Sequence, residues 1–190
     1  MVQRQQLHRY TYAEYVALEQ LSATKHEFLD GEIYAMAGGS EDHSALAAEV
    51  LRCLGNTVGN RPCRVHPSDM RIYAEAAGFA TFPDGAVICG PFQQHPPSPN
   101  ATALNPQVLL EVTSDSSVEY DTGAKLEIYR TIPTLREYIV VSHRERRITV
   151  HGRRGTEWST HVAIAGGRVR IESMDAELVV DEIYRGSAIS

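Results

Sequence analysis

The 190-residue sequence has few cysteines, few lysines and no long run of apolar residues. A membrane-spanning helix needs about 18 or more consecutive apolar residues, and no stretch of the chain approaches that length. The N-terminal segment MVQRQQLHRY also lacks the apolar core of a signal peptide. These absences predict a soluble cytoplasmic protein that does not contact a membrane.

The three cysteines, Cys53, Cys63 and Cys89, are odd in number and show no Cys-x-x-Cys spacing. This argues against a disulfide framework and against a cysteine zinc site. We therefore expect three reduced and mostly buried thiols. The eight histidines include no pair at i, i+4 and no His-Glu-x-x-His motif, which also disfavours a catalytic zinc site.

Lysine is scarce, because only Lys25 and Lys125 occur among the 18 basic residues. The chain thus uses arginine wherever a general positive charge is sufficient. A lysine ammonium is compact and mobile, and it can orient a water molecule or approach a phosphate, whereas guanidinium is a planar fork. The alternative role for Lys125 is an ordinary helix ion pair with Asp121, four residues earlier.

The net charge of −6 argues against a polyanionic partner, but screening makes the local charge matter more than the total. Between residues 143 and 170, seven arginines occur with only two glutamates. The C-terminal third therefore carries a basic face. The alternative interpretation is that these arginines only form the solvated surface of a hairpin. The arginines are Arg144, Arg146, Arg147, Arg153, Arg154, Arg168 and Arg170.

Capping and turn signals divide the first sixty residues into three elements. Thr11 and Glu14 form a capping-box signature that opens a short helix. The segment HEFLDGEIYAMA alternates around an Asp-Gly pair, which is the strongest short hairpin signal. Ser40 is suited to cap a second helix, whose apolar residues recur at helical spacing and which should end near Gly59.

The remaining sequence predicts an α/β protein of mixed α+β type, with a central mixed sheet flanked by helices. The first helix and hairpin, and the last strands, are additions to this core. We expect one domain over residues 1–190. The expected extended segments are VHPSDMRIYA, FATFPDGAVIC, NPQVLLEV, EYIVVS, RRITVHGR and HVAIA, the proline-rich loop is FQQHPPSPNATALNP, and the second core helix is YDTGAKLEIYRTIP.

Two carboxylates stand within apolar segments. Glu111 interrupts the run QVLLEV, where an unpaired carboxylate would be costly to bury. Asp84 follows Pro83, in a strand whose hydrogen-bond ladder the proline interrupts. If these strands pair, the two carboxylates converge at one end of the sheet, and a divalent cation between them relieves their repulsion. The alternative for Glu111 is a buried salt bridge to an arginine.

Three features of the chain resemble the active site of the PD-(D/E)XK nuclease superfamily. They are a proline-aspartate pair, an acidic residue in an apolar strand and a basic residue after it. The surrounding segments resemble the Uma-type putative restriction endonuclease family over about residues 10 to 185, and they occur in the same order. The superfamily has lysine two residues beyond the second acid, where this chain has Thr113. The resemblance assigns that lysine's role to Lys125. The matching segments include KHEFLDGEIYAMAG, SDMRIYA, FPDGAVICG, NPQVLLEVTSDSS and YDTGAKLEIYRTIPTLREYIVVS.

The resemblance implies a restriction-endonuclease-like fold and a divalent-metal-dependent endonuclease that hydrolyses phosphodiester bonds in DNA. RNA is the alternative substrate. Asp84 and Glu111 would bind Mg²⁺ or Mn²⁺, and together with Lys125 they would be the catalytic residues. Cleavage of a duplex needs two such sites, which suggests a homodimer. The expected contacts to backbone phosphates come from Arg144, Arg146, Arg147, Arg153 and Arg154.

Other residues in matching segments have weaker assignments. Glu27 is a candidate auxiliary residue, and its alternatives are a partner for Lys25 or an exposed strand position. His43 is expected to cap or support its helix, and Asp69 is expected in a turn or at a strand start. A competing function is a catalytically inactive nuclease-like domain that binds nucleic acid or protein. A third is a small-molecule enzyme that uses the two acids for acid-base catalysis.

Overall fold

The computed structural model describes residues 8–96 and 102–190, so the first seven residues and residues 97–101 of the predicted proline-rich loop lie outside the described part. The predicted mixed α+β class is confirmed. The helices are α1 (Tyr12–Leu21), α2 (Glu41–Val58), α3 (Val118–Thr122), α4 (Ala124–Arg130) and α5 (Val180–Ile183). The strands are β1 (His26–Leu29), β2 (Glu32–Ala35), β3 (Cys63–Pro67), β4 (Arg71–Ala74), β5 (Phe79–Thr81), β6 (Gly85–Cys89), β7 (Thr102–Ala103), β8 (Pro106–Val112), β9 (Glu137–Val141), β10 (Arg147–Arg154), β11 (Glu157–Ile164), β12 (Arg168–Ile171) and β13 (Ala176–Val179).

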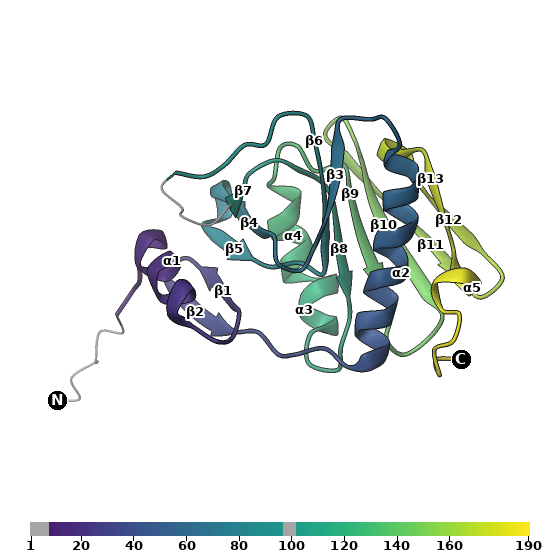
Figure 1. Ribbon diagram of the computed structural model, residues 1–190, viewed down its shortest axis with the longest axis horizontal. Coiled ribbons are helices and arrows are strands. Elements are labelled where there is room, and N and C mark those ends of the chain that lie inside the picture. Colours follow the sequence, from purple (N-terminus) through teal and green to yellow (C-terminus); the bar gives the residue numbers. More distant parts are fainter. Residues whose placement is uncertain (1–7, 97–101) are drawn as a thin grey trace.

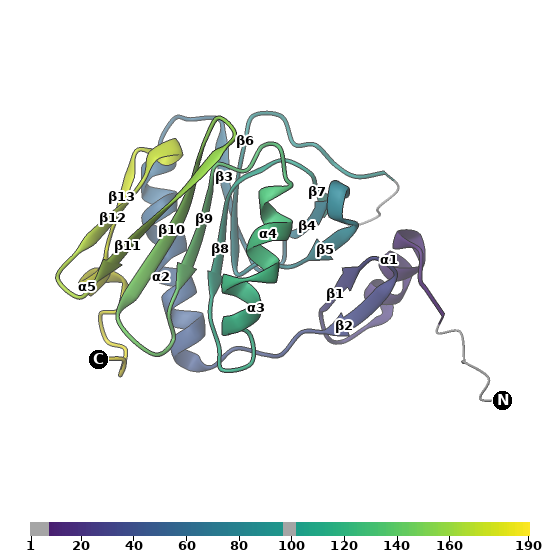
Figure 2. The same cartoon turned by 180° about the vertical axis from the view of Figure 1, so that it is seen from behind.

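A six-stranded sheet forms the centre of the molecule, in the order β11-β10-β9-β8-β6-β3. Helix α2 covers one face, and α3 and α4 cover the other (Figures 1 and 2). Strands β8 and β9 are parallel, and the other neighbours in this sheet are antiparallel. The parallel pair needs a crossover connection, and α3 with α4 provides it.

Strand β8 is buried on both faces, as its apolar sequence predicts. Val108, Leu110 and Val112 pack in the cluster that contains α2. Leu109 packs with α4 in a second cluster. Because side chains alternate along a strand, Glu111 lies on the same face as Leu109, beneath α4.

Two smaller sheets lie outside the central sheet. The predicted N-terminal hairpin belongs to the first of them, whereas the predicted last strands, RRITVHGR and HVAIA, are β10 and β11 of the central sheet and therefore extend it. The order β2-β1-β5-β4-β7 forms the first, and α1 packs on it through Tyr15 and Val16. The second contains only β12 and β13, which sequence patterning missed. Val169 and Ile171 of β12 pack into the cluster on the α2 face.

The local signals of the N-terminal half are confirmed. Thr11 and Glu14 form the reciprocal capping box of α1. Ser40 caps α2 by accepting a hydrogen bond from the backbone of His43, and the helix ends before Gly59. The Asp-Gly hairpin turn has positive φ at both residues, 43° and 90°, as a tight turn between antiparallel strands requires.

The second core helix is not continuous, which corrects the prediction over YDTGAKLEIYRTIP. It divides into α3 and α4 at Gly123, whose φ of −118° and ψ of −97° are not helical. A Cβ atom there would lie 2.8 Å from the carbonyl oxygen of Glu119. Glycine therefore permits a break that redirects α4 relative to α3.

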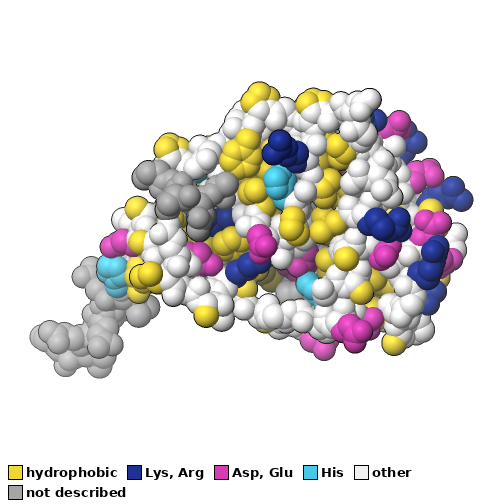
Figure 3. Space-filling view, viewed as in Figure 1, with side chains coloured by type: hydrophobic (Ala, Val, Ile, Leu, Met, Phe, Trp, Pro, Cys, Tyr) yellow, Lys and Arg dark blue, Asp and Glu magenta, His cyan; other side chains and the backbone are white. Residues whose placement is uncertain are grey.

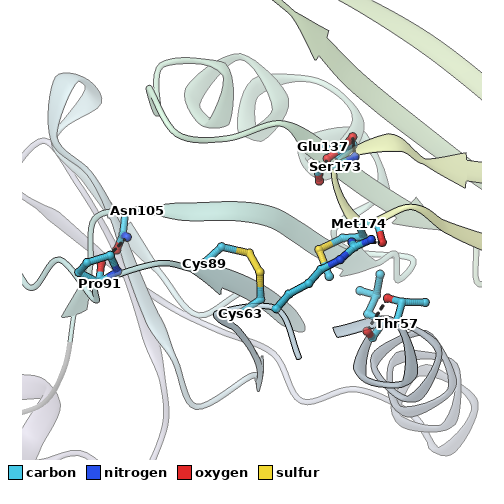
Figure 4. Close-up of a disulfide and its surroundings, with 10 residues drawn as sticks. Thr57, Cys63, Cys89, Pro91, Asn105, Glu137, Ser173 and Met174 are labelled. Carbon is cyan, nitrogen blue, oxygen red and sulfur yellow. Dashed lines mark hydrogen bonds between the residues drawn. A yellow bond between two sulfur atoms is a disulfide. The ribbon is translucent and has the colours of Figure 1, made fainter. Parts of the chain in front are cut away.

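The expectation of three reduced cysteines is wrong. Cys63 and Cys89 form a disulfide between β3 and β6 (Figure 4). They are direct partners in the strand register, so they become neighbours only when the two strands pair, and their spacing in the chain gives no indication of it. Cys53 has a free thiol. Within the described ranges, no helix is long and apolar enough to cross a membrane.

We predict that Ser40→Ala lowers the free energy of unfolding by about 1 kcal/mol, because the first turn of α2 loses its capping acceptor. Urea unfolding measures the change. The exposed Ser44 lies in the same helix without a capping role, so Ser44→Ala should change stability by less than about 0.5 kcal/mol. Equal effects of the two substitutions would contradict the capping role.

Candidate active site

The two acids of the sequence motif meet at one end of the central sheet. Gly85 of β6 pairs with Leu110 of β8, which brings the preceding Asp84 beside Glu111. The Asp84 carboxylate accepts a hydrogen bond from the backbone N–H of Val112, at 2.7 Å from Oδ2. The backbone of β8 therefore fixes the orientation of the Asp84 side chain.

Glu111 is only 5% exposed, and two donors share its Oε1 atom. The hydroxyl of Tyr129 donates at 2.7 Å, and the ammonium of Lys125 lies at 2.9 Å. An arginine partner, the alternative expected from the sequence, is wrong. Burial raises the pKa of Glu111 and Lys125 opposes this effect, while the nearby Asp84 and Asp121 also raise it; the net result is a pKa of about 8.

Lys125 is buried at the centre of three carboxylates. Its Nζ atom lies 2.9 Å from Glu111 and 2.9 Å from Glu27, and 3.6 Å from Asp121. The i, i+4 pair with Asp121 exists, but it is the longest of the three contacts. Burial lowers the pKa of Lys125, and the three carboxylates outweigh that effect and raise it above its usual value. The ammonium therefore stays charged.

Glu27 reaches the site from β1, in the small sheet of order β2-β1-β5-β4-β7. Besides Lys125, its Oε1 accepts a hydrogen bond from the hydroxyl of Thr81 at 2.6 Å. Both alternatives for Glu27 are wrong, because Lys25 pairs with Asp69 at 2.8 Å and the Glu27 side chain is 13% exposed. Asp69 lies in the turn before β4, as expected.

His43 takes part in the site as well as in its helix, which the sequence did not indicate. Its Nε2 atom lies 3.2 Å from Oδ2 of Asp84. The hydrogen bond with Asp84 raises the pKa of His43, and burial opposes this effect. The Ser40 cap fixes the start of α2 and so the position of this ring. Tyr129 was also missed, although its place four residues after Lys125 puts both on one face of α4.

The oxygen donors of this site suit a hard divalent cation. Mg²⁺ is usually held by one or two carboxylates, with water and substrate phosphate completing its coordination. The carboxylates of Asp84 and Glu111 are oxygen donors of that type. In residues 8–96 and 102–190 there is no group of three or more His, Cys, Asp or Glu side chains placed to hold a metal ion. Lys125 and His43 instead lie against the two acids.

Thr113, at the position where the superfamily has lysine, points into a different network. Its Oγ1 lies 2.7 Å from Nδ1 of His143, and Nε2 of that ring lies 3.0 Å from Asp115. Arg144 also contacts Asp115 at 2.7 Å. These contacts join the loops that follow β8 and β9, at the same end of the sheet as Glu111.

The predicted phosphate-binding arginines do not gather in one place. Val112, Val141 and Ile148 align across three strands, so Arg144, Arg146 and Arg147 lie at the Glu111 end of the sheet. Arg153 and Arg154 lie at the far end of β10. Arg154 is about 17 Å along the strand from Thr149, which shares a row with Glu111.

The basic face of the C-terminal third is largely balanced by acids. Arg154 lies 3.8 Å from Glu172, and Arg168 lies 3.4 Å from Glu177. Figure 3 shows basic and acidic side chains interspersed over the end of the molecule that carries β12 and β13. This part of the surface matches the alternative of a solvated hairpin surface.

Comparison with known proteins shows the family of this chain. Residues 12–180 match the profile of Uma2, described as "Putative restriction endonuclease". The chain belongs to the Uma2 family. It is 32% identical over 176 residues to the Synechocystis protein slr1290, which covers 92% of this chain and 91% of that protein. A second Synechocystis relative, sll1609, is 34% identical over 131 residues and covers 69% of this chain and 73% of that protein. Both carry the description "Uncharacterized protein".

A solved structure extends the comparison to the fold of this Uma2 chain. The crystal structure of an Anabaena variabilis protein, described as "a putative nuclease belonging to DUF820", superposes with a TM-score of 0.73 at 18% identity. The match covers 92% of this chain and 97% of that chain. The restriction-endonuclease-like fold expected from the resemblance is therefore confirmed, and the family and fold together indicate a nuclease.

We predict that Lys125→Met lowers the free energy of unfolding by about 3 kcal/mol at pH 8, because three buried carboxylates lose their counter-charge. Without Lys125, the folded-state pKa values of Glu111 and Asp121 rise further, so the loss shrinks as pH falls towards 5 and these two groups take up protons. Urea unfolding at the two pH values measures this dependence.

The other lysine provides the matched control for this variant. Lys25 is partly exposed and pairs with Asp69, whose side chain is 86% exposed. Lys25→Met should therefore cost less than about 1 kcal/mol, with little dependence on pH. A Lys125→Met protein that is as stable as the wild type at pH 8 would refute the central role of the ammonium.

Proposed function

We propose that this Uma2 protein is a divalent-metal-dependent endonuclease that hydrolyses phosphodiester bonds in DNA. The observation that carries the proposal is the meeting of Asp84, Glu111 and Lys125 at one end of the central sheet, in a chain whose family and fold are those of nucleases. Fold alone would not be sufficient, because chemistry resides in the site.

The charges of the site support binding of a cation. Four carboxylates, those of Glu27, Asp84, Glu111 and Asp121, face Lys125 and one histidine. This surplus of negative charge lies where most side chains are buried, so screening by water is weak. Asp84 and Glu111, with the Val112 carbonyl, would hold Mg²⁺ or Mn²⁺. A bound ion of this kind polarises a scissile phosphate and lowers the pKa of an attacking water molecule.

The protein's own groups have distinct roles in this proposal. The Val112 N–H keeps the Asp84 carboxylate in one orientation, and the Tyr129 hydroxyl does the same for Glu111. Lys125 stays protonated, so it acts as a hydrogen-bond donor and not as a base. Its ammonium would orient the attacking water and stabilise the charge that develops on the phosphoryl oxygens.

Substitution of the acids separates this function from an inactive nuclease-like binding domain. Isothermal titration with Mn²⁺ and plasmid cleavage should both fail for Asp84→Ala, with cleavage reduced at least about 100-fold, because the oxygen donors are lost. Lys125→Met should retain Mn²⁺ binding but lose cleavage to a similar extent. Lys25→Met should match the wild type in both assays. If Asp84→Ala binds Mn²⁺ like the wild type, the proposed site is wrong; if no variant cleaves, including the wild type, the binding domain is favoured.

Arginines at the site end of the sheet would contact the DNA backbone. Arg144 has a side chain that is 60% exposed beside the network of Asp115. We predict that Arg144→Gln weakens duplex binding in Ca²⁺ about threefold to tenfold at low salt, for all sequences alike, and reduces the salt slope by about one. Fluorescence anisotropy over a salt series measures both quantities.

A surface arginine away from the site provides the control for this measurement. Arg52 lies on α2 and pairs with Glu49 at 2.7 Å. Arg52→Gln should leave both affinity and salt slope unchanged. If the two variants behave alike, the loops after β8 and β9 do not face the DNA.

A further inference from the structure

Strand β11 ends the central sheet without the features that usually protect such an edge. It pairs with β10 over all eight of its residues, with no bulge. Its sequence EWSTHVAI contains no lysine, arginine or proline, and its one formal charge is Glu157 at its start. Exposed edges are normally blunted by charge, proline, bulges or a covering element, because their backbone groups accept another strand.

The backbone hydrogen bonds of β10 define which groups of β11 face outward. The N–H of Arg153 donates to the carbonyl of Arg136, and the N–H of Ser142 donates to that of Arg147, so odd-numbered residues of β10 face β9. Even-numbered residues of β10 therefore bond to the odd-numbered residues of β11. The backbone groups directed away from β10 belong to Trp158, Thr160, Val162 and Ile164, and the Ile164 carbonyl accepts from Gly167 in a turn.

The side chains of these same residues lie on the α4 face, where β11 is open. Val162 is 50% exposed and Ile164 is 58% exposed. Strand β12 packs against the opposite face through Val169 and Ile171. Across the described ranges, no other strand pairs with the outer side of β11.

We propose that β11 pairs in antiparallel fashion with β11 of a second copy of this chain, about a twofold axis at His161. The two central sheets then form one continuous sheet. In this register Trp158 lies opposite the partner's Ile164, and Thr160 lies opposite the partner's Val162. Aromatic and β-branched residues are favourable cross-strand pairs, and these pairs cover both exposed aliphatic side chains.

The same strand is complementary to itself in charge and in hydrogen bonding. The single charge, Glu157, lies opposite the partner's Ala165, so no like charges meet. The outward groups form about six backbone hydrogen bonds across the axis. A foreign peptide would need this pattern by coincidence, whereas twofold pairing brings the same surface of each copy together. Because one strand pair is small for an interface, we expect a dimer that depends on concentration in the micromolar range.

The pairing would also bring together arginines that lie at opposite ends of the sheet within one copy. This point alone rests on the proposed function. The hairpin turn between β10 and β11 would lie beside the loop of residues 142–146 in the partner. Arg153 and Arg154 of one copy would thus join the partner's arginines at the end of the sheet that carries the partner's Glu111.

Sedimentation velocity from about 1 to 300 μM tests the dimer without reference to activity. Val162→Pro removes an outward N–H and leaves the pairing with β10 intact, as proline requires at a sheet edge. It should raise the dimer dissociation constant at least about tenfold while circular dichroism shows a folded chain. Leu21→Lys, at an 88% exposed position on α1, should not change it. A wild type that stays monomeric, or a Val162→Pro protein that dimerises equally well, would overturn the proposal.

Cross-linking tests the register in a Cys53→Ala background, with oxidised glutathione as the oxidant. His161→Cys places two thiols opposite each other in a pair without hydrogen bonds, where Cα atoms are about 4.5 Å apart and a disulfide fits. Ser159→Cys places the two thiols four positions apart, about 13 Å along the strand. Covalent dimer should form from His161→Cys and not from Ser159→Cys. Equal yields, or no dimer from either, would exclude this pairing.

Discussion

The contact of the Lys125 ammonium with Glu27, Glu111 and Asp121 connects three parts of the molecule through one buried charge. Glu111 belongs to the central sheet and Glu27 to the small sheet, while Lys125 and Asp121 lie on the two short helices between β8 and β9. One buried cation therefore adds a polar link between the two sheets, beside the apolar packing of Phe79 against Leu109 and Tyr129. Removing it would leave several carboxylates buried together, a state far more costly than an open surface ion pair.

Gly123 is what makes this contact geometrically accessible. A continuous helix over residues 118–130 would hold Lys125 and Asp121 in the same helix, with the ion pair as an ordinary surface feature. The break at Gly123 redirects α4, and Lys125 and Tyr129 then lie over Glu111. A side chain at position 123 would meet the Glu119 carbonyl, so the position of the ammonium depends on a residue that has no functional group.

The sequence contained the signals for the convergence of Asp84 and Glu111, on the condition that their strands pair, and β6 and β8 do pair. It also contained the caps of α1 and α2, which depend on residues within one turn. It did not contain the contact of Glu27 with Lys125, or that of His43 with Asp84, because each joins elements that are distant in the chain. The disulfide between Cys63 and Cys89 was missed for the same reason. Strands β12 and β13 were missed because a strand of only four residues gives a weak periodic signal.

Lys125 and His43 together explain how an acidic site remains folded before any metal binds. Each places a positive or hydrogen-bonding group on one of the two proposed ligands, Glu111 and Asp84. Burial raises the pKa of Glu111 even with Lys125 beside it, and loss of the ammonium would raise that pKa further. The fold thus carries its own counter-charges, in contrast to small zinc domains whose folding depends on the metal. Binding of a divalent ion to the proposed ligands would then compete with these internal contacts, which would link metal affinity to the position of the lysine that we propose for the chemistry.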